Sequence, residues 1–343
     1  MKKLFSLFLV LTMVLAFVPA AMADDPIEIG VISYNWANTF QSYLNAGFRY
    51  WNEQYDNVNI TLYDGENDQS IENDKIDIML NKGIDVLCCN LVDTAAAPTV
   101  IEKCRAAGVP IVFYNKMPAP EALASYDHCL YVGVTTRNQG KLQGEFYQQA
   151  LESGKFDTNG DGKLQYVMIQ GQPGHSDVVE RYGGFKEYLD GNGIPYEELD
   201  AQTADWDAAK AKSLMETWIG KYGETIEIVF AQNDAMAIAA VEALRGAGLI
   251  NETSMIPVVG INALPETSQL IKDGFMLGSV LTNPTAVANA SVDLAIRAVE
   301  TGATYETWCE GTQWVLEADR SVRIPDVVIT AENVDIAVDA YKR

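Results

Sequence analysis

Basic residues and histidines are scarce in this chain of 343 residues. It contains 24 Lys and Arg against 47 Asp and Glu, and its two histidines, His128 and His175, lie far apart. The acidic excess repels nucleic acid and anionic membrane surfaces, and no basic helix-turn-helix stands near the N-terminus. Two distant histidines give little support for a His-rich zinc site or a Ser/His/Asp triad. We therefore expect no nucleic-acid partner.

An apolar run follows two lysines at the N-terminus. It spans residues 4–18, and Pro19 and the small residues Ala21 and Ala23 come after it. This order is typical of a cleaved secretory signal peptide. A membrane anchor is the alternative, but a spanning helix needs about 20 apolar residues. We expect cleavage after Ala23 and release into a periplasm. Loss of residues 1–23 would remove two of the 24 basic residues and leave, against 47 acidic ones, a formal charge of −25.

The cysteines are few, odd in number and without the spacing of a zinc site. They are Cys88, Cys89, Cys104, Cys129 and Cys309. None precedes position 88, so the expected cleavage point offers no cysteine to carry a lipid. A chain of this length does not need disulfide staples. Cys88 and Cys89 lie in the apolar run IDVLCCNLV, which is typical of a core strand, and whether any disulfide forms stays open.

Short apolar runs alternate with amphipathic segments from residue 27 onward. The runs span residues 27–34, 58–63, 84–91, 110–115, 130–134, 164–170, 226–231, 256–261 and 278–282, and helix-like segments include 40–54, 96–108, 138–154 and 234–248. Continuous β-branched runs separated by helices predict parallel sheets with helices on both faces. The chain is about twice a typical domain length. We therefore predict an α/β fold with two doubly wound parallel-sheet lobes.

Polar and aromatic residues follow the predicted strands. In open sheets of this kind, ligands bind beyond the carboxyl ends of the strands. Planar amides and carboxylates can grip neighbouring hydroxyls, and an aromatic ring can cover the C–H face of a sugar, so a polyol ligand is expected. The alternative is that Asn and Asp simply form turns and helix caps. The residues are Asn35, Trp36, Asn38, Phe40, Asn90, Asp93, Gln232, Asn233, Asp234, Asn262, Thr282 and Asn283.

The segment PGHSDVVER follows another predicted strand. Ser176 is placed to cap a helix, and Asp177 and Arg181 would share one helix face at i, i+4. That spacing is common for surface ion pairs worth about 0.3–0.5 kcal/mol. On spacing alone, the surface pair is favoured over a ligand site.

Residues 157–165, DTNGDGKLQ, match the first nine positions of a calcium loop. Such loops place oxygen side chains at positions 1, 3, 5 and 9, glycine at 6, a backbone carbonyl at 7 and a bidentate Glu at 12. The twelfth position is Met168. Either the match is accidental and the segment is a solvated acidic turn, or a distant carboxylate completes the site. The matching residues are Asp157, Asn159, Asp161, Gly162, Lys163 and Gln165.

Together, these stretches resemble the periplasmic glucose/galactose-binding proteins, within the type I periplasmic binding proteins. The likeness covers nearly all of residues 27–330, and a calcium-loop variant followed closely by PGH is not a general feature of sugar-binding relatives. It is carried by NDQSIENDKIDIMLNKGID, NLVDTAAAPTVIEKCR, DTNGDGKLQYVMIQGQPGH, IEIVFAQNDAMAIAAVEALR and INALPE.

The resemblance implies two lobes joined by a three-segment hinge, with a sugar in the cleft between them. The first lobe would comprise residues 24–114 and 283–321, and the second residues 115–282 and 322–343. It also implies that Glu227, at the start of a later strand, supplies the missing calcium ligand. Ca²⁺ would then be held by Asp157, Asn159, Asp161, the Lys163 carbonyl, Gln165 and Glu227, and oxygen ligands suit a hard cation.

For the sugar, the resemblance implies two stacking rings, Phe40 and Trp206. It implies polar contacts from Asn90, His175, Asp177, Arg181 and Asn233. Three further site positions depart from the family pattern: Asn38 and Asn262 replace aspartates, and Thr282 replaces an asparagine. An asparagine both accepts and donates hydrogen bonds, whereas an aspartate only accepts them. A monosaccharide is still expected, but the departures leave its identity open.

The implied function is delivery of a monosaccharide to an ABC importer. The partners would be the sugar and the transporter permease, with a chemoreceptor as a further partner that the resemblance allows, and the protein is expected to act as a monomer. A cytoplasmic sugar-responsive regulator of the same fold is opposed by the export signal and the acidic charge. A glycosidase needs two carboxylates, and Asp177 is the only one among the implied sugar contacts, so we expect no enzyme activity.

Overall fold

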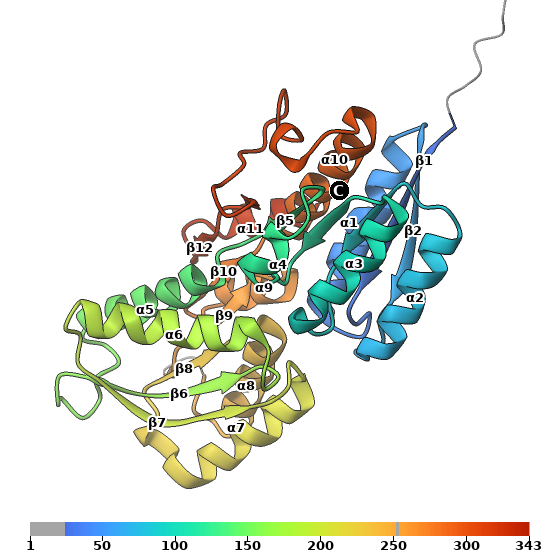
Figure 1. The fold of residues 1–343 in the computed structure, drawn as a ribbon. Coiled ribbons are helices and arrows are strands. Elements are labelled where there is room, and N and C mark those ends of the chain that lie inside the picture. Colours follow the sequence, from blue (N-terminus) through green and yellow to red (C-terminus); the bar gives the residue numbers. More distant parts are fainter. Residues whose placement is uncertain (1–24, 252–253, 343) are drawn as a thin grey trace, which may run out of the picture.

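The computed structural model describes residues 25–251 and 254–342. The predicted signal peptide, residues 1–23 with its cleavage point after Ala23, lies outside the described residues. Within the described part of the chain, no helix combines the length and the apolar character needed to cross a membrane. The chain folds into two lobes, each built on its own six-stranded sheet (Figure 1).

The first sheet has the strand order β11-β5-β4-β3-β1-β2, and all neighbouring strands are parallel. Helices α1 and α10 pack on one face, and α2, α3 and α4 pack on the other. The strands are β1 (Ile27–Ser33), β2 (Val58–Asp64), β3 (Val86–Cys89), β4 (Ile111–Tyr114), β5 (Cys129–Gly133) and β11 (Ser321–Arg323). The helices are α1 (Thr39–Gln54), α2 (Gln69–Asn81), α3 (Ala97–Ala107), α4 (Pro120–Ala124) and α10 (Pro284–Thr301).

The second sheet has the order β12-β10-β9-β8-β6-β7, parallel except for β12, which is antiparallel to β10. Helices α5 and α6 cover one face, and α7, α8, α9 and α11 cover the other. The strands are β6 (Leu164–Gln170), β7 (Tyr196–Thr203), β8 (Ile228–Ala231), β9 (Val258–Asn262), β10 (Gly278–Leu281) and β12 (Val327–Ile329). The helices are α5 (Thr136–Glu152), α6 (Ser176–Gly191), α7 (Ala208–Tyr222), α8 (Asp234–Gly246), α9 (Pro265–Lys272) and α11 (Val334–Ala340).

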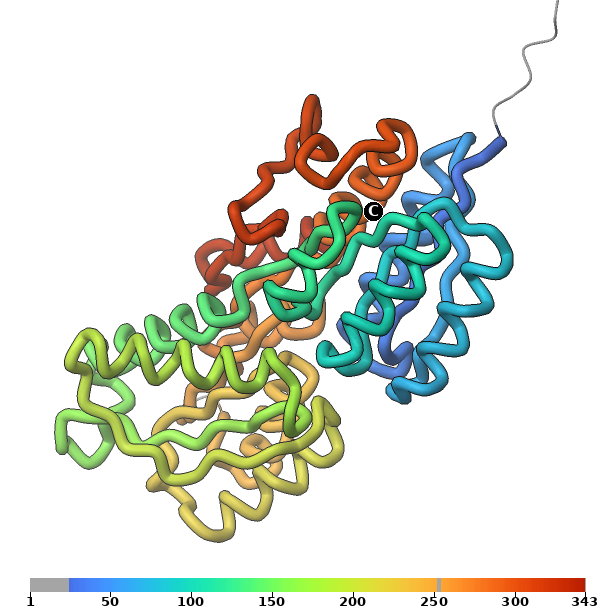
Figure 2. The backbone as a smooth tube through the Cα atoms, viewed as in Figure 1, coloured from blue at the N-terminus to red at the C-terminus, as the bar shows by residue number. Residues whose placement is uncertain are grey.

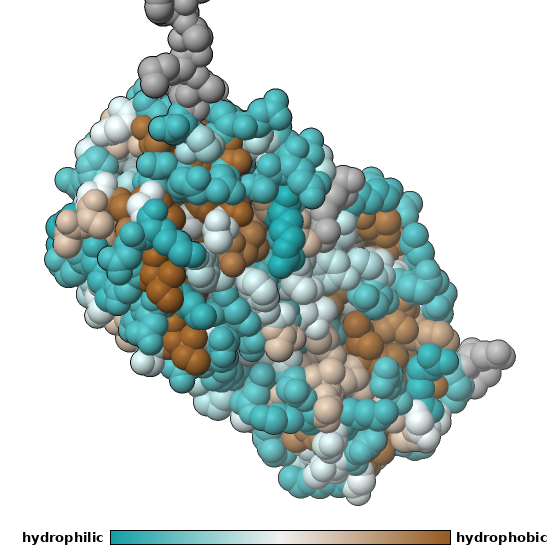
Figure 3. All heavy atoms as spheres, turned by 90° about the vertical axis from the view of Figure 1, so that its right-hand side faces the viewer, coloured by the Kyte–Doolittle hydropathy of each residue, from teal (hydrophilic) through white to brown (hydrophobic). Residues whose placement is uncertain are grey.

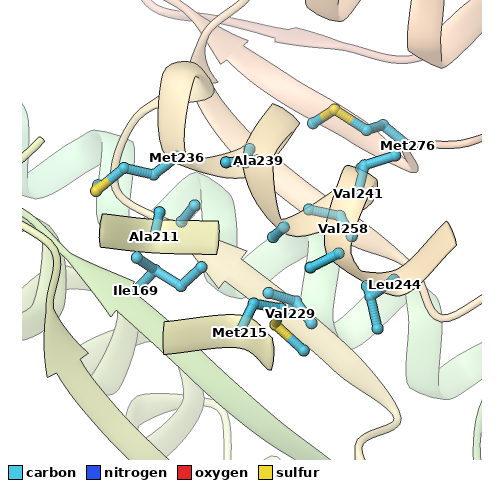
Figure 4. Close-up of a cluster of buried hydrophobic side chains, with 14 of the residues drawn as sticks. Ile169, Ala211, Met215, Val229, Met236, Ala239, Val241, Leu244, Val258 and Met276 are labelled. Carbon is cyan, nitrogen blue, oxygen red and sulfur yellow. The ribbon is translucent and has the colours of Figure 1, made fainter. Parts of the chain in front are cut away.

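Apolar runs form the strands because both faces of each sheet are covered. The central strands β3, β4 and β8 are buried at every position. Figure 4 shows one of the resulting cores, where Met215 of α7 and Leu244 of α8 pack with Val229 of β8. Cys88 and Cys89 belong to the first lobe's core, as predicted, and none of the five cysteines forms a disulfide. The predicted α/β fold with two doubly wound lobes is confirmed.

Two of the expected lobe boundaries are wrong. The strand β5 pairs with β4, so the chain first crosses between the lobes after Gly133 and not after residue 114. Strand β5 is buried at every position and lies between β4 and β11 in the first sheet. The last crossing follows Arg323 and not residue 321, because β11 pairs with β5 as far as Arg323. The second crossing lies between β10 and α10, as expected at residue 282 (Figure 2).

Three strands, β7, β11 and β12, were missed by the sequence prediction. Strand β7 lies at the edge of its sheet, and none of its residues is fully buried. Its sequence YEELDAQT therefore lacks the apolar run that indicates a buried strand. Strands β11 and β12 have three residues each, which is too short for periodicity to show.

Helices α5 and α6 lie side by side and approach closely at glycines (Figure 1). A Cβ added at Gly140 would lie 1.9 Å from the Arg181 backbone oxygen, and one added at Gly184 would lie 2.0 Å from the Arg137 oxygen. Real Cβ atoms do not approach that closely. These glycines therefore allow the two backbones to touch.

Most of the face in Figure 3 is hydrophilic, with apolar residues in small patches. Among the described residues, the exposed large apolar side chains are Trp36, Ile78, Val179, Val315 and Ile336. Single apolar residues of this kind are normal on a protein surface.

We predict that Gly184→Ala destabilises the second lobe, because the new methyl group meets backbone that cannot rotate away. The free energy of unfolding should fall by roughly 1–3 kcal/mol, measured by urea denaturation. The matched control is Gly220→Ala in α7, where an added Cβ meets nothing within 4 Å. There the free energy should rise by up to about 1 kcal/mol. Equal effects at the two positions would contradict the close packing of α5 on α6.

Candidate interlobe binding site

The carboxyl ends of strands from both sheets meet around one small inner cavity of about 30 Å³. The two lobes are in contact beside it, because the Tyr34 ring of the first lobe lies 6.4 Å from the His175 ring of the second, measured between centroids. The cavity is lined by Tyr34, Asn38, Phe40, Gln41 and Asn115 of the first lobe and by His175, Asp177, Arg181, Trp206, Asn233 and Asn262 of the second. Eight of the ten predicted sugar contacts are therefore brought together.

Phe40 and Trp206 line this cavity from opposite lobes. Phe40 lies in the first turn of α1 and is 8% exposed. The indole of Trp206 is 5.2 Å from the His175 ring, measured between centroids, and its Nε1 is buried without a hydrogen-bond partner. Trp206 has a φ of 63°, which is uncommon for a residue other than glycine and often found at functional sites. A Cβ at Gly171 would lie 2.1 Å from the indole, so only glycine leaves room for this ring.

Three predicted contacts also cap helices. The Asn38 Oδ1 accepts from the Gln41 N–H at 3.2 Å, and the Asn233 Oδ1 accepts from the Met236 N–H at 2.9 Å. The His175 Nδ1 accepts from the Asp177 N–H at 3.2 Å, so His175 and not Ser176 is the N-cap of α6. The turn-and-cap interpretation and the ligand interpretation therefore both apply to these residues. Capping uses one acceptor of each side chain and leaves the Asn amide donors free of that bond.

Spacing alone favours a surface ion pair between Asp177 and Arg181, but in the structure this pair does not lie on the surface. Their side chains are only 10% and 7% exposed, and the Asp177 Oδ2 is 3.7 Å from the Arg181 Nη2. Arg181 also donates from Nη1 to the Gln232 carbonyl at 2.7 Å and from Nε to the Gln139 Oε1 at 2.9 Å. Two edges of the guanidinium are thus held by protein groups, and the side chain reaches the cavity.

The imidazole of His175 is kept neutral. Burial lowers its pKa from 6.5 to about 4, with Lys116 and Arg181 acting in the same direction and Asp177 opposing them. Because Nδ1 accepts a hydrogen bond from backbone, the proton of the neutral ring belongs on Nε2. His175 therefore offers one donor to a ligand.

Two predicted contacts, Asn90 and Thr282, do not line the cavity. Asn90 is fully buried and donates to the Gln41 Oε1 at 2.7 Å, while its own Oδ1 has no partner. The Thr282 Oγ1 accepts from the Gln139 Nε2 at 2.7 Å. Asn90 is therefore one residue removed from the inner cavity, and Thr282 is connected to it only through Gln139 and Arg181.

The sequence prediction missed Tyr34, Gln41 and Asn115, which also line the cavity. Each stands directly beside a predicted feature: Tyr34 and Asn115 follow strands, and Gln41 follows Phe40. The rule that ligands bind beyond strand ends could have found the first two. Lys116 comes next in the chain, and its Nζ lies 3.6 Å from the centroid of the Tyr34 ring. Burial lowers its pKa to about 8.

Three larger cavities share lining residues with the inner one. One of about 490 Å³ shares Tyr34, Asn38 and Trp206, one of about 440 Å³ shares Asn115 and Asp177, and one of about 260 Å³ shares His175.

The predicted calcium loop lies beyond the end of α5, at the end of the second lobe that points away from the first (Figure 1). Gly160 and Gly162 have φ of 72° and 81°, which permits the tight turn. Glu227, 3% exposed, reaches the loop as predicted by the resemblance: its Oε1 accepts from the Thr158 N–H at 2.6 Å, and its Oε2 accepts from the Gln165 N–H at 3.1 Å.

The loop oxygens are mostly engaged by donors of the loop itself. Asp157 accepts from the N–H groups of Gly160 and Gly162, and Asp161 accepts from the Gln165 Nε2 at 2.9 Å. Among the residues that the structure describes, no three His, Cys, Asp or Glu side chains are grouped as a metal site. The oxygen ligands fit a hard cation in kind, but Asp157, Asp161 and Glu227 are not drawn together.

A family model described as a periplasmic binding protein domain matches residues 29–304. The chain is 36% identical over 317 residues to the D-galactose/methyl-galactoside binding periplasmic protein of Haemophilus influenzae, and the match covers 92% of each protein. It is 24% identical over 297 residues to the ribose import binding protein of Escherichia coli, covering 86% of this chain and 92% of that protein.

A solved structure with the same fold is the ABC transporter solute binding protein of Bacillus halodurans with bound myo-inositol. Its TM-score is 0.76 at 24% identity, and the match covers 93% of this chain and all of that one. At this identity, the likeness bears on the fold alone.

We predict that the His175 ring does not titrate between about pH 5.5 and 8, because burial holds its pKa near 4. In a His128→Gln variant, His175 is the only histidine left to follow by NMR. The unfolded chain binds a proton near pH 6.5 and the folded chain near pH 4, so this histidine makes the free energy of unfolding fall as pH drops through that window. A titration midpoint near 6.5 in the folded protein would contradict its burial.

Proposed function

Because the chain belongs to the periplasmic binding protein family, we propose that it is the sugar-binding component of an ABC importer. Its ligand is a monosaccharide related to galactose or glucose, and its membrane partner is the permease of that importer. The relative from Haemophilus influenzae carries D-galactose and methyl-galactoside binding in its name, which supports a hexose ligand. The predicted signal peptide supports work in the periplasm.

The observation that carries this proposal is that sugar-type contacts from both lobes line a single cavity. Phe40 from one lobe and Trp206 from the other supply aromatic faces, and His175, Asp177 and Arg181 supply polar groups. A ligand held by both lobes favours the closed arrangement, because it contacts both of them only when they close. A permease can distinguish the two arrangements.

The departures at Asn38 and Asn262 bear on which sugar binds. The Asn38 Oδ1 is used in the cap of α1, so this side chain offers its amide hydrogens to a ligand where an aspartate would offer oxygens. The preferred sugar therefore places an acceptor oxygen at that point. Asp177 is the one carboxylate of the inner cavity lining, which supports binding without hydrolysis, since glycoside hydrolysis needs two.

We also propose a structural calcium ion held by the oxygens of Asp157, Asn159, Asp161, Lys163, Gln165 and Glu227. The support is the loop spacing, the two left-handed glycines and the placement of Glu227 against the loop. A bound Ca²⁺ would supply positive charge that draws the three carboxylates together.

The sugar site is tested by titration calorimetry against a panel of hexoses, pentoses and inositols. At least one should bind with a Kd near ~1 µM or tighter, about 8 kcal/mol. Trp206→Ala should weaken that binding at least about tenfold through loss of ring contact. Trp36→Ala is the control, because Trp36 is exposed and does not line the cavity. If no monosaccharide binds the wild-type protein, the proposed function is wrong.

The calcium site is tested by thermal unfolding with added Ca²⁺ or with EDTA. Calcium at about 100 times its Kd should stabilise the folded state by roughly 2.7 kcal/mol. Glu227→Gln should lose this response, because one carboxylate oxygen becomes a donor. The exposed Glu224→Gln should keep it. A melting temperature that neither calcium nor EDTA moves would exclude the site and leave the sugar site untouched.

A further inference from the structure

The three segments that cross between the lobes are joined at one side chain, Gln139. It lies at the start of α5, just after the first crossing. Its Nε2 donates to the Thr282 Oγ1 at 2.7 Å and to the Asp326 Oδ1 at 2.9 Å. Thr282 follows β10 in the second crossing, and Asp326 lies between β11 and β12 in the third. Gln139 is fully buried, and both hydrogen bonds that its Nε2 donates are made within the hinge.

The remaining atom of this amide connects the hinge to the binding site. The Gln139 Oε1 accepts from the Nε of Arg181 at 2.9 Å. This contact depends on the close packing of α5 on α6, because Gly140, the next residue, touches the Arg181 backbone and allows no side chain there. The amide of Gln139 therefore has all its main hydrogen-bonding positions occupied, two by the hinge and one by a residue of the inner cavity.

We propose that Gln139 is a positioning residue that couples sugar binding to the closing of the lobes. Through Thr282 and Asp326 it fixes the three crossings relative to one another, and through Arg181 it fixes a side chain that contacts the sugar. The proposal rests on the proposed function in one respect, which is that Arg181 touches the ligand.

The departure at Thr282 agrees with this role. The resemblance implies an asparagine sugar contact at this position, whereas Thr282 is 3% exposed and lies outside the cavity lining, and its hydroxyl accepts from Gln139. The side chain at this position therefore serves the hinge. Its hydroxyl is within hydrogen-bond distance of an amide that also contacts Arg181, so a change at Thr282 can reach the site without touching the ligand.

Charge also links the third crossing to the site. Burial raises the pKa of Asp326 to about 6, opposed by hydrogen bonds from Asn138 and Gln139 and by the charges of Arg181 and Arg323. Tyr131 of β5 is a titratable group that also interacts with Asp326. An ionised carboxylate accepts more strongly than a neutral one, so protonation of Asp326 weakens its hold on Gln139.

The test compares two buried glutamines of α5 that lie one turn apart. Gln139→Leu removes the hinge amide, whereas Gln143→Leu removes an amide that donates only to carbonyls of the second lobe, Ala231 at 2.9 Å and Gly260 at 3.5 Å. Both side chains are fully buried, so both variants should lower the melting temperature. Thr282→Val, which keeps the shape and removes the hydroxyl, gives a second hinge variant if Gln139→Leu does not fold.

Two readouts separate coupling from stability. The first is the affinity for D-galactose, or for the tightest sugar of the panel, by calorimetry. Gln139→Leu and Thr282→Val should weaken it at least about fivefold, the equivalent of one lost hydrogen bond, and Gln143→Leu should leave it within about twofold. The second is small-angle X-ray scattering of the ligand-free protein. The hinge variants should have a larger radius of gyration than the wild type, and Gln143→Leu should not.

A pH series adds a third readout. The wild-type affinity should fall as pH drops through about 6, and Asp326→Asn should make the profile flat across that range. If the wild type binds sugar and the hinge variants keep both its affinity and its radius of gyration, the coupling role is wrong while the proposed function stands. If the wild type binds no sugar but the scattering differs as expected, the hinge role stands and the ligand assignment fails.

Discussion

The arginine at position 181 carries a positive charge that is almost completely removed from water, and groups from α5, α6 and the end of β8 surround it. An unpaired buried charge is very costly, so its guanidinium needs partners on every side. It has the Gln232 carbonyl, the Gln139 amide oxygen and the nearby Asp177 carboxylate. Burial nevertheless lowers its pKa, with Asp177 and Asp326 opposing the effect. A ligand that offers hydroxyl oxygens to the remaining N–H groups completes this environment.

Three residues that line the inner cavity also cap helices. Asn38, His175 and Asn233 satisfy the first N–H groups of helices α1, α6 and α8, and these helices begin where the strands end. The same capping bonds fix the orientation of each side chain. The polar atoms that make no capping bond therefore point in fixed directions. Either asparagine or aspartate can cap a helix. A substitution of one by the other can therefore keep the cap and still change the hydrogen-bonding groups that face the cavity.

The sequence was sufficient to predict the fold class, because both sheets are covered on two faces and their central strands read as unbroken apolar runs. It was sufficient for most of the cavity because ligands bind beyond strand ends, and the resemblance then selected residues such as Trp206. Strand β7 was not predicted, because an edge strand that is half exposed to solvent lacks an unbroken apolar run. The lobe assignment of β5 depends on strand pairing, which spacing along the chain does not reveal. The buried state of Asp177 and Arg181 was hidden for a similar reason: an i, i+4 pair looks the same in sequence whether water or another lobe covers it.

The central claim is that a monosaccharide lies between the two lobes, held by rings from both and by the guanidinium of Arg181. A crystal structure grown with the tightest sugar of the panel tests it most directly. We expect electron density for the sugar between Phe40 and Trp206, within hydrogen-bond distance of Arg181 and His175. Density for the sugar elsewhere, or an indole at position 206 turned away from it into solvent, would contradict the account.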